Sequence, residues 1–295
     1  MTLGELLNLI EKRLSEVSPS WKAEARTIIC HVLNVETLDL VLSRDKMVTE
    51  AQLSQVEEMI RLRIGRYPLQ YSLSKQDFYG LEFYVDSNVL IPRPETEILV
   101  EFVIGEAKRM HKGQTGRILD IGVGSGAIVV SLAHHLSHFR FVACDIDFGA
   151  LAVAKRNGEK HGLNERITWI QSDLFANIDR KSTFDIIVSN PPYIPISDLA
   201  NLEPEVSNHE PHLALFAGED GLDFYRRIIP EALVFLTDGG LLAFEAGHDQ
   251  HMAVEALFKE HGYIDVGHFN DLNGIPRFIY GKKHQVEGDI RCLKD

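Results

Sequence analysis

Residues 1–75 show the hydrophobic period of α-helices. The pattern predicts a first helix with an inner face made of Leu3, Leu6, Leu7, Ile10 and Leu14. Thr2-Leu-Gly-Glu5 has the spacing of a capping box, and Thr49-Glu-Ala-Gln52 repeats it before a later helix. The inner face of that later helix is expected to hold Leu53, Val56, Ile60 and Ile64. The basic run Arg61, Arg63 and Arg66 is expected on a solvated face, with a docking patch as the less favoured alternative. With a further helix expected over residues 21–33, this part of the chain is predicted to be a small helical bundle.

The period changes after this bundle. Pro68 disfavours helical geometry in the residue before it, and a short hairpin linker is expected over residues 76–93. Apolar strand candidates then alternate with helical stretches, which is typical of a right-handed parallel α/β sheet. The expected strands are residues 117–121, 140–144, 167–170, 184–188 and 240–244, and the expected helices are 95–110, 127–135, 149–161 and 222–236.

The last part of the chain has a different pattern. Residues 263–268 and 277–280 flank Asn270-Asp-Leu-Asn-Gly274 and are expected to close the sheet as an antiparallel hairpin. The sequence thus predicts an α/β domain over residues 94–295, preceded by the helical domain and the linker.

Composition and charge exclude several classes of protein. With 45% hydrophobic and 25% charged residues, the chain resembles soluble globular proteins and not disordered ones. The net charge is −13, whereas residues 1–75 carry ten basic and ten acidic side chains, so the whole acidic excess belongs to the rest of the chain. Negative charge opposes binding to phosphate backbones and anionic lipid, so nucleic acid is not an expected partner.

Cysteine and histidine patterns give no sign of a metal site or of export. Cys30, Cys144 and Cys292 lie far apart, without a C-x-x-C pair, which fits a reducing cytoplasm. His134, His135 and His138 have no carboxylate or thiol at ligand spacing, so no metal is expected. The N-terminus has no signal-peptide pattern, and no apolar run is long enough for a membrane span.

A glycine loop follows the first expected strand of the sheet. Ile118-Leu-Asp-Ile-Gly-Val-Gly-Ser-Gly126 places Asp120 before Gly122, Gly124 and Gly126. The spacing G-x-G-x-G differs from the G-x-G-x-x-G that seats a pyrophosphate, and an acid would repel that group. Asp120 suits a ligand with an ammonium group, such as the methionine part of S-adenosylmethionine. An ordinary tight turn is the competing interpretation of the glycines alone.

Acidic residues follow the next two strands at the same edge of the sheet. Asp145 is placed to accept hydrogen bonds from ribose hydroxyls, and Asp173 from an adenine amino group. A single acid of this kind is often a solvated cap. Together with Asp120, however, the three predict a nucleoside with a cationic tail.

Val188-Ser-Asn-Pro-Pro-Tyr193 ends the expected strand 184–188 and indicates the reaction. Pro191 biases Asn190 toward an extended conformation, so the Asn190 side-chain carbonyl and a proline carbonyl can form a fixed pair of acceptors. Two acceptors match one NH2 group, and Tyr193 adds an aromatic face for a planar amide or base. The competing interpretation, a simple turn, is less favoured at a strand end beside a nucleoside pattern.

These motifs resemble the PrmC/HemK family, the protein-(glutamine-N5) methyltransferases of peptide chain release factors. The resemblance covers nearly the whole chain. Besides the motifs above, it rests on Phe78-Tyr-Gly80, Val89-Leu-Ile-Pro-Arg-Pro-Glu-Thr-Glu97, Glu210-Pro211, residues 218–222, Phe244-Glu-Ala-Gly247 and Asp271-Leu-Asn-Gly274. Residues 91–97 are the most specific, because N6-adenine methyltransferases share Asn-Pro-Pro-Tyr but lack that segment.

The resemblance implies a Rossmann-like methyltransferase sheet of seven strands, the last antiparallel, with a helical substrate-docking domain at the N-terminus. It implies S-adenosyl-L-methionine as cofactor and, as substrate, the glutamine of a GGQ motif in a release factor. N6-adenine methylation of DNA or RNA and a nucleoside-binding sensor are the alternatives, the first disfavoured by charge. A cytoplasmic monomer is expected.

The candidate site residues fall into three sets. Catalysis is assigned to Asn190, Pro191 and Tyr193. Cofactor binding is assigned to Asp120, Gly122, Gly124, Gly126, Asp145, Ile146, Asp173, Leu174 and Asn190. Substrate binding is assigned to Asn190, Pro191, Pro192, Tyr193, Arg93 and Glu97.

Overall fold

The computed structural model describes residues 1–111 and 114–285, so Cys292 lies outside the described residues. The chain forms two compact units. The helical unit contains residues 1–75 together with 202–209, and the sheet unit contains 76–201 and the described residues from 210 onward. The sequence analysis places residues 202–209 in the α/β domain, whereas in the structure they belong to the helical unit.

The helical unit is the bundle that the hydrophobic pattern predicts. Its helices are α1 (Leu3–Leu14), α2 (Trp21–Leu33), α3 (Asp39–Leu42), α4 (Glu50–Ile64) and α5 (Leu69–Leu73), with α9 (Pro204–His209) in the inserted segment. Both capping boxes form, because Thr2 and Thr49 each exchange hydrogen bonds with the residue three positions on. The core of the bundle includes Leu6, Ile10, Ile28, Val56 and Ile60.

Two predictions for the end of α4 are wrong. Ile64 is 38% exposed, so the inner face ends at Ile60. Arg63, expected on a solvated face, is buried, with its guanidinium 2.9 Å from Glu24 and 2.7 Å from Glu205 of α9. A buried arginine is tolerated only when carboxylates pair with it, and the inserted segment supplies one of the two.

The sheet unit contains a seven-stranded mixed sheet, which confirms the predicted fold class. The strands lie in the order β5-β4-β3-β6-β7-β9-β8, and β9 runs antiparallel to both neighbours. Their bounds are β3 (Gly116–Ile121), β4 (Phe139–Asp145), β5 (Ile167–Gln171), β6 (Phe184–Ser189), β7 (Leu236–Glu245), β8 (Ile264–Asn270) and β9 (Pro276–Lys282). Each strand that the sequence predicts is present.

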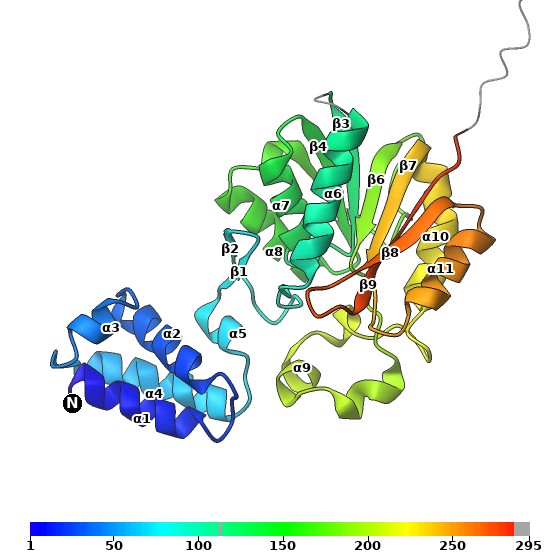
Figure 1. Cartoon of the computed structure of the whole chain (residues 1–295). Coiled ribbons are helices and arrows are strands. Elements are labelled where there is room, and N and C mark those ends of the chain that lie inside the picture. The colour runs from blue at the N-terminus through cyan, green and yellow to red at the C-terminus, as the bar shows by residue number, and fades with distance from the viewer. Residues whose placement is uncertain (112–113, 286–295) are drawn as a thin grey trace, which may run out of the picture. The chain divides into compact units, whose positions relative to one another are not determined.

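Helices cover both faces of the sheet (Figure 1). Consecutive strand residues such as Ile118 and Leu119 point to opposite faces, and each joins a different hydrophobic core. One core includes residues of α6 (Thr96–His111), α7 (Ala127–His135) and α8 (Phe148–Lys160). The other includes residues of α10 (Asp223–Phe235) and α11 (His251–Glu260), of which α11 was not predicted.

The expected hairpin linker packs as part of the sheet unit. Strands β1 (Gln76–Phe78) and β2 (Leu81–Phe83) pair antiparallel, and Phe78 and Phe83 are buried in the first core. The backbone of Tyr84 exchanges two hydrogen bonds with the side chain of Asn157 on α8. The short 3-10 helices are η1 (Asn164–Arg166), η2 (Ile196–Asn201) and η3 (His212–Ala214). In residues 1–111 and 114–285, we find no helix long and apolar enough to cross a membrane.

Candidate active site

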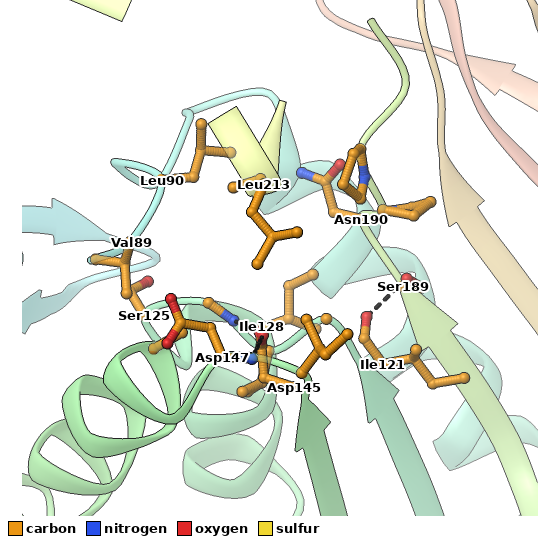
Figure 2. Close-up of a pocket in the computed structure, with 18 of the residues that line it drawn as sticks. Val89, Leu90, Ile121, Ser125, Ile128, Asp145, Asp147, Ser189, Asn190 and Leu213 are labelled. Atoms are coloured by element: carbon orange, nitrogen blue, oxygen red, sulfur yellow. Dashed lines mark hydrogen bonds between the residues drawn. The ribbon is translucent and has the colours of Figure 1, made fainter. Parts of the chain in front are cut away.

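A cavity of about 330 Å³ lies where β3, β4, β5 and β6 end. Strand β3 pairs with β4 on one side and with β6 on the other, so the chain reverses its winding direction there. Ligands of open α/β sheets bind at such a switch point, beyond the carboxyl ends of the strands. Figure 2 shows Asp145 and Asn190 on different sides of this cavity, with apolar side chains such as Leu213 between them.

The glycine loop after β3 brings backbone to the wall of the cavity. Gly122 and Gly124 line it with φ angles of 72° and 51°, in the left-handed region that favours glycine. Gly126 does not line the cavity: it precedes α7, and a Cβ atom there would lie 3.2 Å from Ala154 of α8. Of the three glycines, the first two are therefore positioned for a ligand and the third for packing between helices.

Asp145 lines the cavity at the end of β4. Its carboxylate accepts hydrogen bonds from the backbone N–H groups of Gly124 at 2.9 Å and Asp147 at 3.0 Å. Burial raises the pKa of Asp145, and these two hydrogen bonds oppose the increase. Ile146 beside it also lines the cavity and is 49% exposed. The carboxylate is thus held by one N–H of the glycine loop and one N–H of the turn that follows β4, and it is in a position to accept hydrogen bonds from ribose hydroxyls.

Asp120 does not line the cavity, contrary to the prediction of a direct contact with an ammonium group. It is fully buried, and its Oδ2 accepts a hydrogen bond from the N–H of Val129 in α7. Its Oδ1 is buried without a hydrogen-bond partner, and burial raises its pKa well above the usual value for aspartate. The side chain points from β3 to the helix beyond the glycine loop, so we assign it to loop support.

Asp173 and Leu174 line the cavity after β5. Both carboxylate oxygens of Asp173 lie within 2.8 Å of Nη2 of Arg227 on α10, an arginine that also lines the cavity. Leu174 has a φ of 51° and contributes apolar surface. The predicted acceptor for an adenine amino group is thus present, but it shares its oxygens with a cation that the sequence did not indicate.

Asn190, Pro191 and Pro192 line the cavity after β6. The neighbouring Ser189 donates a hydrogen bond to the carbonyl of Ile121 at 2.7 Å, which ties the ends of β6 and β3 together. Asn190 donates from Nδ2 to Oγ1 of Thr96 at 3.3 Å. Because Nδ2 is engaged with Thr96, Oδ1 is the amide atom available as an acceptor for a ligand.

Tyr193, which the sequence assigns to catalysis and substrate binding, is not among the residues that line the cavity. It packs against the second core, and burial raises its pKa to about 12. Its carbonyl accepts a hydrogen bond from Nε2 of Gln250 at 2.9 Å, and a Cβ atom at Gly221 would lie 2.2 Å from the same carbonyl oxygen. Tyr193 therefore anchors the backbone behind Asn190.

Arg93, which precedes α6, and Glu97, in the first turn of α6, have different surroundings. Arg93 lines the cavity and pairs with the buried Glu210 at 2.7 Å. Burial raises the pKa of Glu210, which Arg93 opposes. Glu97 does not line the cavity: its carboxylate accepts a hydrogen bond from the N–H of Tyr79 at 2.9 Å and so holds the hairpin. The structure thus places Glu97 against the hairpin and not among the residues that line the cavity.

Two further residues at or near the cavity, Thr96 and Glu245, were not predicted as site residues. Thr96 lines the cavity, and its hydroxyl donates to Oε2 of Glu245 at 2.6 Å. Both belong to segments that carry the family resemblance, residues 91–97 and 244–247, but neither segment was given a chemical role. The two residues are 149 positions apart in the sequence, so their contact is seen only in the folded structure.

The arrangement fits a nucleoside cofactor with a positively charged group. Left-handed glycines give a backbone wall, Asp145 gives a charged acceptor, and Asn190 adds an acceptor for an NH2 group in the same cavity. A seven-stranded sheet with an antiparallel β9 and such a cavity defines the class of S-adenosylmethionine-dependent methyltransferases.

Comparison with known proteins narrows this class. Residues 96–201 match the family described as Methyltransferase small domain, and residues 5–73 match the PrmC N-terminal domain. The chain is 41% identical to the release factor glutamine methyltransferase of Geobacter sulfurreducens, covering 88% of this chain and 89% of the relative. It is 37% identical to that of Clostridium botulinum, covering 90% and 93%. The chain belongs to the family of release factor glutamine methyltransferases.

A solved structure supports the fold. The hMettl16 catalytic domain, solved in complex with the MAT2A 3'UTR hairpin 6, has a TM-score of 0.57 and 19% sequence identity to this chain. The match covers 81% of this chain and 84% of that one. At this identity the likeness concerns the fold alone.

Proposed function

We propose that this chain transfers a methyl group from S-adenosylmethionine to the side-chain amide nitrogen of a glutamine in a peptide chain release factor, with Asn190 and Pro191 holding the amide. The observation that carries the proposal is the position of Asn190, whose side chain lines the same cavity as the glycine loop and Asp145. An acceptor for an NH2 group thus stands beside a site for the methyl donor.

The cofactor fits the residues that line the cavity. Asp145 would hold the ribose hydroxyls, Gly122 and Gly124 would allow close approach of the methionine part, and Ile146 and Leu174 would enclose the base. The net charge of −13 favours a cofactor that carries a sulfonium. When bound, S-adenosylmethionine supplies an electrophilic methyl group, whose bond to sulfur breaks with its electron pair as the bond to nitrogen forms.

The chain's own residues must compensate for a poor nucleophile. The lone pair of an amide nitrogen is delocalised, and its protons are too weakly acidic for removal by a side chain before transfer. Asn190 Oδ1 and the Pro191 carbonyl, by accepting both amide hydrogens, aim the nitrogen and stabilise the positive charge that develops on it. The nitrogen then loses its extra proton to water. No side-chain base is needed.

Methylation of adenine N6 is not favoured. An adenine NH2 could meet the same acceptors after base flipping, but duplex binding normally needs a basic surface, and the chain has 43 acidic against 30 basic residues. The relatives are named for release factor glutamine. A direct test incubates the protein with methyl-labelled cofactor and either an isolated release factor or DNA. Label on the release factor supports the proposal, and label on DNA contradicts it.

The helical unit is proposed to dock the release factor. None of the residues named as lining the cavity belongs to this unit, so the unit is not needed to form the cofactor wall. In and next to α3 it presents four large apolar side chains that are each at least 65% exposed: Leu38 just before the helix, Val41 and Leu42 in it, and Met47 after it. Apolar side chains concentrated on one surface are typical of a protein interface, and we call this set the α3 patch.

The chain is further proposed to act as a cytoplasmic monomer. Cys30 and Cys144 are free thiols, which fits a reducing compartment such as the cytoplasm. Sedimentation velocity of the purified protein tests the oligomeric state, because a dimer at working concentration would contradict this part of the proposal.

A further inference from the structure

A chain of hydrogen bonds leads away from the cavity behind Asn190. Asn190 Nδ2 donates to Thr96 Oγ1 at 3.3 Å, and Thr96 Oγ1 donates to Glu245 Oε2 at 2.6 Å. Thr96 begins α6, Glu245 ends β7, and Asn190 follows β6, so three separate elements meet at this point. Thr96 and Glu245 are buried, with 4% and 2% of their surface exposed.

The number of hydroxyl protons decides the orientation of the Asn190 amide. A threonine hydroxyl has one proton, and here Thr96 gives it to the carboxylate of Glu245. Only lone pairs of Oγ1 remain for Asn190, so the asparagine must present its NH2 group to Thr96 and keep its carbonyl for the cavity. The opposite orientation would direct the Asn190 NH2 group against the NH2 group of an incoming amide.

We propose that Thr96 and Glu245 are positioning residues for methyl transfer, which keep the carbonyl of Asn190 directed toward the substrate amide. The inference rests on the proposed role of Asn190. Neither residue is required to contact the glutamine, and their effect on the reaction passes through the asparagine.

The protonation state of Glu245 controls this orientation. Burial raises the pKa of Glu245 to about 7, while the hydrogen bond from Thr96 and the charge of Arg277 on β9 oppose the increase. The groups that face Glu245 from the surrounding elements are Thr96, Arg277, Glu95, Arg93, Tyr193 and Tyr225. The ionised carboxylate can only accept, whereas the protonated carboxyl can donate to Thr96 and free the hydroxyl proton to turn to Asn190. Methyl transfer is therefore expected to fall as the pH drops below about 7.

The experiment measures single-turnover methylation of an isolated release factor at saturating S-adenosylmethionine. Thr96→Val removes the hydroxyl but keeps the shape of the side chain, and Thr96→Ser retains the hydroxyl. The rate of Thr96→Val should fall by about tenfold or more, the cost of losing one buried hydrogen bond, while Thr96→Ser stays within about threefold of wild type. The dissociation constant for the cofactor should stay close to wild type in both variants.

A double-mutant cycle separates positioning from simple structural support. In an Asn190→Ala background there is no amide left to orient, so adding Thr96→Val should lower the rate no further. A full additional loss in that background would overturn the inference, since it would show that Thr96 acts without Asn190. If Asn190→Ala alone retains the wild-type rate, the proposed function of Asn190 fails; if it collapses while Thr96→Val stays at the wild-type rate, only the positioning role fails.

The pH profile gives an independent readout, should Thr96→Val fold poorly. Glu245→Gln has no titrating carboxyl, so its single-turnover rate should lose the decrease between about pH 7 and pH 5.5 that the wild type is expected to show. A Glu245→Gln variant that retains the wild-type profile, with the same midpoint, would contradict the assignment to Glu245.

Discussion

Oδ2 of Asp145 accepts a hydrogen bond from the backbone N–H of Gly124 at 2.9 Å. The acid at the end of β4 and the glycine loop after β3 therefore form one wall of the cavity, although 21 positions separate them in the sequence. A cofactor that binds the carboxylate also rests against the loop that the carboxylate fixes. This coupling makes Asp145 the residue on which cofactor affinity should depend most strongly.

Asp145→Ala is expected to weaken binding of S-adenosylmethionine at least tenfold. The change removes a charged acceptor for two ribose hydroxyls, each worth about 1.5 to 3 kcal/mol, and releases the loop. Isothermal titration calorimetry measures the dissociation constant. Asp179→Ala removes the same charge at an exposed position and controls for electrostatic attraction alone. Equal dissociation constants for the wild type and Asp145→Ala would reduce Asp145 to a cap of its own loop.

Arg93→Met is expected to destabilise the protein by about 2 kcal/mol at pH 8. The change leaves the carboxyl of Glu210 buried without its cation; a fully buried pair would cost more, but the Arg93 side chain is 35% exposed and partly screened. Leu213→Ala shortens another cavity side chain, one that is 54% exposed, and should cost less. Urea unfolding followed by circular dichroism measures the difference.

The pH dependence of that effect follows from Glu210. Burial already raises the pKa of Glu210 above its usual value, and loss of Arg93 raises it further. Stability linked to such a raised carboxyl is full below its unfolded pKa of about 4.5 and falls as the pH rises through the folded value. The cost of Arg93→Met should therefore shrink toward pH 4.5 and grow toward pH 8. If Arg93→Met lowers the free energy of unfolding equally at pH 4.5 and at pH 8, Glu210 is not the group responsible.

Charges placed in the α3 patch should weaken docking of the release factor. The double variant Val41→Asp, Leu42→Asp puts two carboxylates where both side chains are exposed, at 68% and 73%, so the fold should tolerate them. The KM for the release factor is expected to rise about tenfold or more, because a charge at an apolar contact must be desolvated, while the dissociation constant for the cofactor is unchanged. Leu272→Asp, on the sheet unit and 94% exposed, is the matched control. An unaltered KM in the double variant would exclude the patch as a docking surface.

The residues at the strand ends could be predicted from the sequence because their positions depend on local pattern. A buried strand followed by an acid or by Asn190 projects that residue from the same edge of a parallel sheet, and Asp145, Asp173 and Asn190 do meet in one cavity. The direction of a side chain depends on more than its strand. Asp120 lies two register positions before the level of Asp145 and Asn190 and turns to α7, which periodicity alone could not distinguish from a contact with the cavity.

Contacts between distant segments could not be predicted in this way. The pair of Thr96 and Glu245 joins residues 149 positions apart, and Glu205 reaches Arg63 across 142. In each case a buried polar group is paired with a residue that is distant in the sequence, so no local sequence pattern predicts the pair. Arg63 shows the consequence most directly, because a run of arginines on a helix looks solvated until a distant segment covers it.

The most direct test of the account is the single-turnover methylation rate of Asn190→Ala on an isolated release factor, at saturating S-adenosylmethionine. Losing one oriented acceptor in an enclosed site costs on the order of 3 kcal/mol of transition-state stabilisation, so the rate should fall more than about a hundredfold. The cofactor should still bind close to wild type, because the charged acceptor Asp145 and the backbone wall of the glycine loop remain in the variant. A variant Asn190→Ala that methylates within about threefold of wild type would contradict the assignment of the reaction to this residue.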